Sequence, residues 1–550
     1  AMKLAGDLAR IATEAGQNLQ AQRLLKRMTP EGKLYYAQQT LESFKKELVD
    51  QYGSQFGNIS IPGDLADALM KAGSQKEQDE ALLAIYRNIA DQLPATWADR
   101  WNAWRYLAML ANPATHIRNV ASNAINIPVR RLKNLIGAAL EPTFVPAGQR
   151  TKSVLNPLDS ADRALKEFAR QDLDNVAAIL DGSQKYNDRQ IIEQLKDPFK
   201  VNGSWGTAAS SPLPQRIARK AADTAAGAAS RLYKANSGAL SAEDTLFKKT
   251  AYTDSLAQYL KANRIDPKTA EGAVLDKARA YAIEEAKRAT YTDANSLAQA
   301  LGRFERTNLY TKALVGGIVP FKTTPLNIIK RGLAYSPAGL VKAMTLDTAL
   351  MRMGRMSAAE MIDNLAQGLT GTGIMALGAF LASQGLVNGV APENKKERDF
   401  KAAGGWQDYS INLPGGGTYT IDWAGPAVMA LLAGVEAFHA SEQDGLGFNE
   451  FLTAMGNITE PLFDTTMLSG INSAIQSATY AGSNPVTAAA GQAVSNFATQ
   501  GIPTLSGQLA RAMDPVRHTP YSDRQGAEGE LWEAAQRITS RIPGLSEQNP

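Results

Sequence analysis

A run of 29 residues without a charged side chain, residues 364–392, constrains the fold of this chain more than any other feature. The run reads NLAQGLTGTGIMALGAFLASQGLVNGVAP, and a second charge-free run of 46 residues covers residues 465–510. Long segments without charges are best accommodated in a protein core, in an interface between subunits or in lipid. The chain therefore needs helices, partners or a membrane to cover these segments.

The most apolar part of the first run is residues 369–386, LTGTGIMALGAFLASQGL. A bilayer crossing needs roughly 20 apolar residues, but the many Gly, Ser and Thr residues make this segment less hydrophobic than a permanent span. Two interpretations stay open: a buried helix of a soluble bundle, and a helix that enters a membrane only under some conditions. The candidate membrane-inserting residues are Leu369, Ile374, Leu377, Phe380 and Leu381.

Small residues four positions apart occur within the same segment. Such pairs allow two helices to approach closely, both in membranes and in soluble bundles. The candidates for this close helix packing are Gly378, Ala379, Ala382 and Ser383.

Charge is distributed unevenly along the chain. The formal net charge is +4, but residues 364–510 contain 4 basic and 11 acidic residues, whereas residues 1–363 carry a net charge of +12. A basic half suits a solvated helical surface, or contact with nucleic acid or anionic lipid. The predicted regions are 1–140 (N-terminal, helical), 141–363 (basic, helical), 364–510 (charge-poor, apolar) and 511–550 (polar tail).

The periodicity of apolar residues predicts the fold class. Apolar residues recur at helical spacing through most of residues 1–363, with prolines between the segments. One β-signal interrupts the pattern: YSINL and TYTIDW alternate around PGGG, which predicts a hairpin near residues 409–423. We therefore expect a mainly α protein, an elongated multi-helix assembly with one small β-hairpin.

Residues 319–337, VPFKTTPLNIIKRGLAYSP, predict a short amphipathic helix between prolines. Thr324 suits the N-cap and Pro325 the first helical position, and Pro337 limits the length of the helix. The apolar face is expected at Leu326, Ile329 and Leu333. The basic residues expected to contact phosphate, of lipid or nucleic acid, are Lys322, Lys330 and Arg331.

No catalytic or metal-binding motif is recognised. The chain has no cysteine, its histidines (His116, His439 and His518) are far apart in sequence, and no Gly-rich phosphate loop is present. We therefore expect a protein that is not an enzyme, without catalytic residues, metal or cofactor. For residues 112–126 we expect a loop capped by Asn and Thr side chains, with His116 hydrogen-bonded in place.

Four segments together resemble the large internal virion proteins, or DNA-ejection proteins, of short-tailed bacteriophages, and segments of large prophage polyvalent proteins. They are NPATHIRNVASNAINIP (112–128), the proline-bracketed stretch 319–337, NKKERDFKAAGGWQDYSINL (394–413) and FATQGIPTLSGQLARAMDPVRHTPY (497–521). The family-like positions are Asn112, Pro113, His116, Arg118, Asn119, Pro320, Phe321, Pro325, Asn327, Trp406 and Tyr409.

The resemblance implies a protein that resides inside the capsid, leaves ahead of the genome and assembles into a channel for genome delivery across the host cell envelope. The implied partners are further copies of the chain in a homo-oligomer, other phage internal or ejection proteins, and the portal or tail. DNA and host membrane lipid are the further implied contacts. Some members carry a lytic transglycosylase, but no matching motif occurs here, so that activity is not expected of this chain, and the question stays open for any longer parent chain.

Two alternatives remain open at this point. The chain fits a helical scaffold segment of a prophage polyvalent protein that is delivered with DNA. It also fits an accessory region of a cell-wall hydrolase. Liposome binding separates the first interpretation from the scaffold, and clearing of peptidoglycan would favour the hydrolase.

Overall fold

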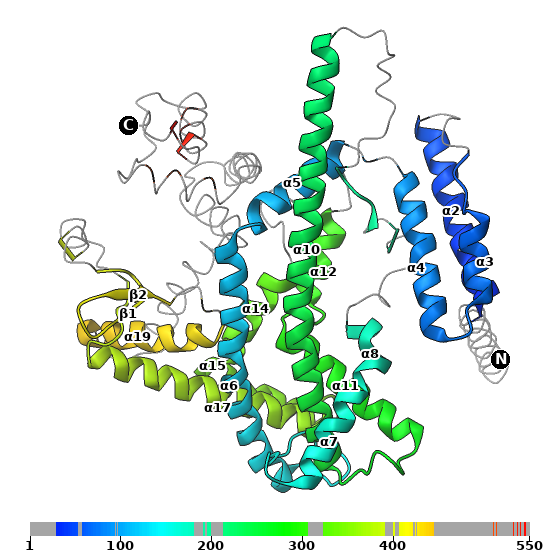
Figure 1. Ribbon diagram of the computed structural model, residues 1–550. Helices are drawn as coiled ribbons and strands as arrows, with labels where there is room; N and C mark the ends of the chain where they lie inside the picture. The colour runs from blue at the N-terminus through cyan, green and yellow to red at the C-terminus, as the bar shows by residue number, and fades with distance from the viewer. Residues whose placement is uncertain are drawn as a thin grey trace, which may run out of the picture. The chain divides into compact units, whose positions relative to one another are not determined.

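The computed structural model describes residues 29–52, 58–93, 97–180, 213–305, 323–390, 406–421 and 426–444, together with short pieces at 191–192, 195–199 and 400–401 and single positions elsewhere (Figure 1). The elements up to residue 305 are α2 (Pro30–Tyr52), α3 (Gly63–Lys71), α4 (Gln75–Gln92), α5 (Trp97–Leu110), α6 (Pro113–Phe144), α7 (Ser160–Gln171), α8 (Leu173–Leu180), α10 (Leu213–Ala262), α11 (Gly272–Ala289) and α12 (Ser296–Glu305). Those that follow are α14 (Thr323–Ala334), α15 (Pro337–Lys342), the π-helical turn η3 (Ala343–Asp347), α16 (Thr348–Arg352), α17 (Ala358–Ser383), strands β1 (Ser410–Asn412) and β2 (Thr418–Thr420), and α19 (Pro426–Asp444).

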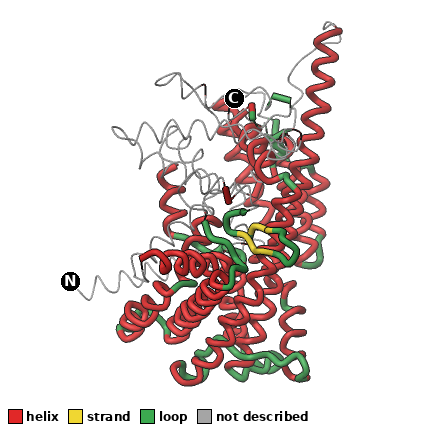
Figure 2. The backbone as a smooth tube through the Cα atoms, turned by 90° about the vertical axis from the view of Figure 1, so that its left-hand side faces the viewer, coloured by secondary structure: helices red, strands yellow, loops and turns green. Residues whose placement is uncertain are grey.

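The prediction of a mainly α fold with one small β-hairpin is confirmed. Helices make up most of the described chain, and one antiparallel hairpin is present within it (Figure 2). Ser410 pairs with Thr420 and Asn412 with Thr418. The turn between the strands uses Gly415 and Gly416 at positive φ, a backbone conformation that residues with a side chain rarely adopt.

The described residues form two compact units. One draws on Ala1–Trp104 and Asp181–Lys234, and the other on Arg105–Leu180 and Ala235–Pro550. Each unit combines segments that are distant in sequence.

The core of the first unit is formed by α2, α3 and α4. Leu41 and Phe44 of α2 pack with Leu69 of α3 and with Ile85 and Ile89 of α4. Helix α4 begins with a capping box, in which the side chain of Ser74 accepts a hydrogen bond from the backbone N–H of Glu77 and the carboxylate of Glu77 accepts one from the backbone N–H of Ser74. These short helices are stable mainly because they bury one apolar face each.

One core of the second unit lies between α7, α8, α11 and the C-terminal part of α10. The fully buried Tyr252 donates its hydroxyl proton to Asp172 at 2.6 Å, and Arg279 donates to the same carboxylate. Leu256 and Leu260 of α10 pack against Ala278 and Ala282 of α11. The small alanines let the two helices approach closely.

Helix α6 corrects one expectation of the sequence analysis. Residues 113–126 are helical, not a capped loop, and the helix continues through Pro128 to Phe144. Asn112 is buried immediately before the helix and its carbonyl accepts from Thr115. His116 is hydrogen-bonded as expected, but to Glu243 and Asn236 of α10. Contacts with α10 therefore stabilise a helix that the Asn-rich sequence does not favour.

Helices α17 and α19 lie side by side, with the β-hairpin between them in sequence (Figure 1). The hairpin packs at the C-terminal end of α17, where the side chain of Asn388 donates to Ser410 and Asn412 and the backbone of Val387 pairs with Ile411. The described part of the charge-free run, residues 364–390, thus forms most of α17 and the segment that directly follows it.

Candidate functional site

The helix pair α17–α19 is held by two glycines that bring the backbones together. A Cβ atom added at Gly378 of α17 would meet the carbonyl oxygen of Leu431, and one added at Gly434 of α19 would meet the carbonyl oxygen of Met375. No side chain fits at either point, so the contact depends on glycine. Of the small residues predicted to pack helices, Gly378 and Ala382 lie in this buried interface.

Of the remaining two small-residue candidates, Ala379 borders this interface and Ser383 does not. Ala379 is half-buried, and its backbone nitrogen lies next to Gly434. Ser383 is exposed and donates its hydroxyl proton to the carbonyl of Phe380.

The opposite face of α17 is apolar and exposed. Leu377 and Phe380 are 49% and 58% exposed, and Leu369 lies on the same side of the helix. Ile374 and Leu381 are half-buried, and Leu381 packs on the core formed with α19. Of the five predicted membrane-inserting residues, three are therefore accessible, one is half-buried and one packs on a core of the protein.

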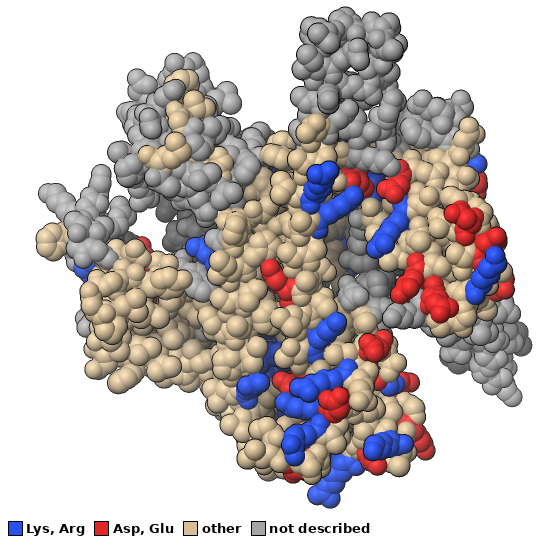
Figure 3. All heavy atoms as spheres, in the orientation of Figure 1, with Lys and Arg blue, Asp and Glu red and all other residues tan. Residues whose placement is uncertain are grey.

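Within the part of the chain that the structure describes, α17 is the one helix long and apolar enough to cross a membrane by length and composition. Its best 18-residue window has a mean hydropathy of 1.4, and 39% of that window is buried. Figure 3 shows an almost uncharged surface over α17, α19 and the hairpin, whereas charged side chains gather over α7, α10 and α11.

The N-terminal half of α17 lies beside a cluster of buried charges that the sequence analysis missed. Lys133 of α6 pairs with Asp363 of α17 at 2.8 Å, and Lys152 pairs with Glu285 of α11 at 2.9 Å. Lys152 also lies 3.2 Å from Asp363 and donates to the hydroxyl of Tyr281 at 2.6 Å. Two lysines and two carboxylates thus join two helices and the 145–159 loop to α17.

The pKa shifts in this cluster follow from burial and from the balance of charges. Burial alone would raise the pKa of both carboxyl groups, but the two lysines outweigh it and hold the pKa of Glu285 and Asp363 below the usual range. Burial lowers the pKa of Lys133, whereas Asp363 and Glu285 overcome burial at Lys152 and raise its pKa. Both carboxyl groups are therefore ionised at neutral pH.

Helix α14 is attached to the same region by polar contacts, and its buried face differs from the predicted one. The fully buried Asn327 donates to the carbonyls of Tyr291 and Asp293 and accepts from Asn295. Leu333, predicted to be buried, is exposed. The turn after α11 has buried carbonyl groups that need hydrogen-bond donors. The amide of Asn327 can donate to them and an apolar side chain cannot, so the face of α14 that carries Asn327 is the buried one.

The basic residues predicted to contact phosphate on α14 lie in different environments. Arg331 is turned inward and pairs with Asp293 at 3.0 Å, whereas Lys330 is exposed. Lys322 lies outside the described residues. The helix begins at Thr323, one residue before the predicted N-cap Thr324, and includes Pro325 in its first turn. It ends at Ala334, before Pro337 as predicted, and Pro337 begins α15.

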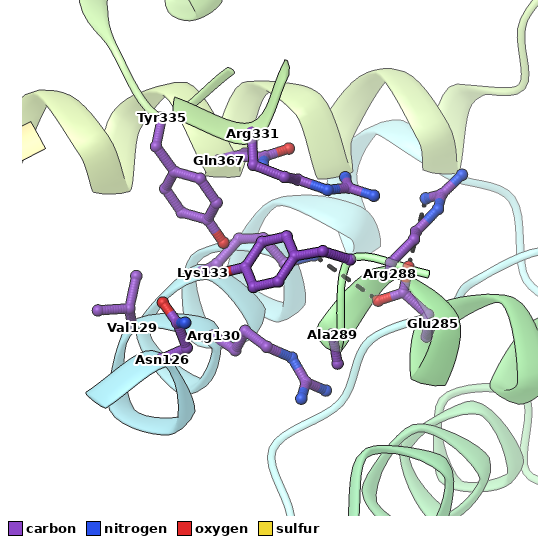
Figure 4. Close-up of a pocket in the computed structure, with 11 residues that line it drawn as sticks. Asn126, Val129, Arg130, Lys133, Glu285, Arg288, Ala289, Arg331, Tyr335 and Gln367 are labelled. Atoms are coloured by element: carbon purple, nitrogen blue, oxygen red, sulfur yellow. Dashed lines mark hydrogen bonds and ion pairs between the residues drawn. The ribbon is translucent and has the colours of Figure 1, made fainter. Parts of the chain in front are cut away.

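A cavity of about 40 Å³ lies where α6, α11, α14 and α17 converge (Figure 4). Asn126, Arg130 and Lys133 reach it from α6, Glu285 and Arg288 from α11, and Arg331 from α14. Its lining also includes Val129, Ala289, Tyr291, Tyr335 and Gln367. Within the described residues, no three His, Asp or Glu side chains are arranged to hold a metal ion.

The family-like positions fall into two groups. Several are structural: Pro113 opens α6, Asn119 donates to Glu243, and Tyr409 is buried with a positive φ at the start of β1. Trp406 lies 4.7 Å under the ammonium of Lys401, and Arg118 is exposed on α6. Pro320 and Phe321 lie outside the described residues, as do most of residues 465–510.

Comparison with known proteins adds no assignment. No family model, no curated protein and no solved structure matches this chain.

Proposed function

We propose that this chain is a noncatalytic internal virion protein of a bacteriophage, which oligomerises into a conduit for genome delivery and engages the host membrane. The observation that carries the proposal is the α17–α19 pair. It combines a helix of bilayer-spanning length, an uncharged exposed face and glycines that hold a second apolar helix against it. The resemblance of the four sequence segments to ejection proteins supports the same function.

The contacts of α17 and α19 are of a kind that a membrane can preserve or replace. The contacts between α17 and α19 are van der Waals contacts and a glycine-mediated backbone approach, both of which persist in lipid. The exposed face of α17 presents Leu369, Leu377 and Phe380, whose transfer from water to hydrocarbon is favourable. The exposed face of α17 therefore loses no polar contact when it meets a bilayer. Exposed apolar patches of this kind are typical of surfaces that contact membranes or other proteins.

Liposome co-flotation of the purified chain tests the proposal. Each Asp at the centre of a bilayer costs about 2.5–3.5 kcal/mol, so Leu377→Asp combined with Phe380→Asp should abolish salt-resistant flotation. The matched control is Leu158→Asp combined with Leu246→Asp, two exposed leucines outside α17 and α19, which should float like the wild type.

Circular dichroism of every variant verifies that it is folded. Ring or tube particles in electron micrographs of the floated wild type would support a conduit. Absence of flotation, or unchanged flotation of the folded Leu377→Asp, Phe380→Asp variant, would overturn the role of α17 as the inserting element. The scaffold segment of a polyvalent protein would then be the better interpretation.

A further inference from the structure

The cavity between α6, α11, α14 and α17 is rich in positive charge. Its lining contains four cationic side chains and one carboxylate, that of Glu285. The cations are Arg130, Lys133, Arg288 and Arg331. Nearby carboxylates compensate three of these cations, since Asp293 pairs with Arg331, Asp363 with Lys133, and Glu284 and Glu285 with Arg288.

Arg130 is the cation of the lining whose charge the protein leaves uncompensated. No carboxylate of the described chain makes an ion pair with it. Its charge acts on the hydroxyls of both Tyr291 and Tyr335, as does the charge of Arg331. The two guanidinium groups therefore lie near the same two phenols, on the cavity wall.

The cavity also holds hydrogen-bond donors that the protein does not fully use. The Nε group of Arg331 is buried without a hydrogen-bond partner, and Asn126, which is only 7% exposed, makes no well-formed hydrogen bond through Nδ2 beyond a contact with Tyr291. Burial raises the pKa of Tyr291 and of Tyr335, so both hydroxyls stay protonated and able to donate. Buried donors without partners are costly, and a bound acceptor would remove that cost.

We infer that this cavity binds a single phosphate-type oxyanion. Guanidinium groups present forked donors that match the oxygens of phosphate, and the Asn and Tyr side chains add neutral donors. The volume is about 40 Å³, and on this measure roughly 10–15 Å³ holds one water molecule. The site therefore suits one phosphate group and excludes a base-paired polymer. The ligand class is a phosphate monoester or inorganic phosphate.

Direct binding is measured first, on the full chain. Thermal unfolding is followed with sodium phosphate or with sodium chloride at matched ionic strength, because a ligand that binds only the folded state raises the melting temperature with its concentration. Phosphorus NMR line broadening reports the same binding without unfolding. We expect stabilisation and broadening with phosphate and neither with chloride. Equal effects of the two salts, with no broadening, would overturn the inference.

A pair of neighbouring arginines provides the matched variants. Arg130→Gln removes the uncompensated cation of the cavity, whereas Arg131→Gln removes an exposed cation outside the lining, one residue along α6. Arg130→Gln should weaken phosphate binding by about tenfold or more, as expected for a charge-assisted hydrogen bond, and Arg131→Gln should leave it unchanged. Equal weakening in both would indicate general charge attraction and contradict the site.

Tyr291→Phe serves as a second variant, since it removes one hydroxyl and keeps the ring. Weaker phosphate binding by Tyr291→Phe supports the site even if Arg130→Gln is unstable. Unchanged binding in both folded variants would contradict it.

Vesicles distinguish the two sources of the phosphate. Phosphatidic acid exposes a phosphate monoester at the membrane surface, and phosphatidylcholine does not. If the natural ligand is a lipid head group, Arg130→Gln should lower flotation on phosphatidic acid vesicles and free phosphate should compete with it. If binding is to free phosphate alone, vesicle flotation should not differ between Arg130→Gln and Arg131→Gln. Either result is compatible with the cavity as an oxyanion site, which does not depend on membrane insertion of α17.

Discussion

The two halves of α17 are held by opposite kinds of contact. Asp363, near the start of the helix, lies in a buried network with two lysines, whereas Gly378, near its end, packs on the backbone of α19 beneath an uncharged face. If the first half left the protein, buried charges would lose their ion-pair partners, which is costly in any apolar medium. Removal of the second half would lose only apolar contacts, which lipid can replace. The helix thus combines a fixed end with an end suited to a change of environment.

The largest effect is expected at the fixed end. Glu285→Gln leaves Lys152 and Lys133 with one carboxylate between them, so the free energy of unfolding should fall by about 3–5 kcal/mol in urea titrations followed by circular dichroism. The control is Glu284→Gln, at the neighbouring position on α11. The carboxylate of Glu284 is half-exposed and lies 4.0 Å from Arg288. Its effect should stay below about 0.5 kcal/mol. Similar losses in both variants would mean that the buried network is not what fixes this end.

The next largest effect is expected at the glycine contact. Gly378→Ala places a methyl group against the carbonyl of Leu431 and should cost about 2–3 kcal/mol, because the helices must move apart. Gly373→Ala on the same helix meets nothing within 4 Å and should instead stabilise by about 0.5–1 kcal/mol through helix propensity. If α17 and α19 pack as described, the melting temperature falls in Gly378→Ala and rises in Gly373→Ala. Changes of the same sign in both variants would contradict this packing.

A smaller effect is expected at α14. Asn327→Ala leaves the carbonyls of Tyr291 and Asp293 without their donor, which should cost about 1–2 kcal/mol. Lys330→Ala, three residues along the same helix and exposed, should change stability by less than about 0.5 kcal/mol. Chemical unfolding of both variants measures the difference. A neutral Asn327→Ala would show that apolar packing, not the amide, holds this helix.

The last prediction concerns the pH dependence of stability that the charge cluster causes, which is smallest at physiological pH because both carboxyl groups are ionised there. The pKa of Glu285 and of Asp363 is lower in the folded than in the unfolded chain, so the folded state releases their protons more readily. Their stabilisation is present above about pH 4, the unfolded value, and is lost as pH falls through the folded values. Unfolding free energies measured at falling pH should therefore decrease below that point, and less steeply in Glu285→Gln. An equal slope in the variant would assign the acid sensitivity to other carboxylates.

The sequence predicts the elements of the second half better than their environment. The alternation around PGGG correctly predicts the hairpin, and α14 ends at Ala334, within the limit that Pro337 sets, because turn and helix-end signals are local. The prediction of a loop at residues 112–126 is wrong. Asn and Thr have weak helix propensity, and the hydrogen bonds from α10 that offset it come from a distant part of the chain.

The buried charge cluster has almost no local signature. Its members are Lys133, Lys152, Glu285 and Asp363, and each lies in a segment with ordinary charged residues around it. One signal was present: Asp363 is the last charged residue before the charge-free run, a position where a polar helix end meets an apolar one. Nothing in the sequence indicates which lysine approaches it, since the partners are more than 200 residues away.

The sequence by itself determined the helical class, the hairpin and the contrast between a basic half and an uncharged stretch, because these depend on composition and on short-range periodicity. Only the tertiary structure decided that Arg331 is turned inward, that Asn327 is buried and that four helices enclose a cationic cavity. The reason is physical. Side-chain burial and ion pairing depend on what distant segments offer, and a polar group is buried wherever its hydrogen bonds and charge are satisfied.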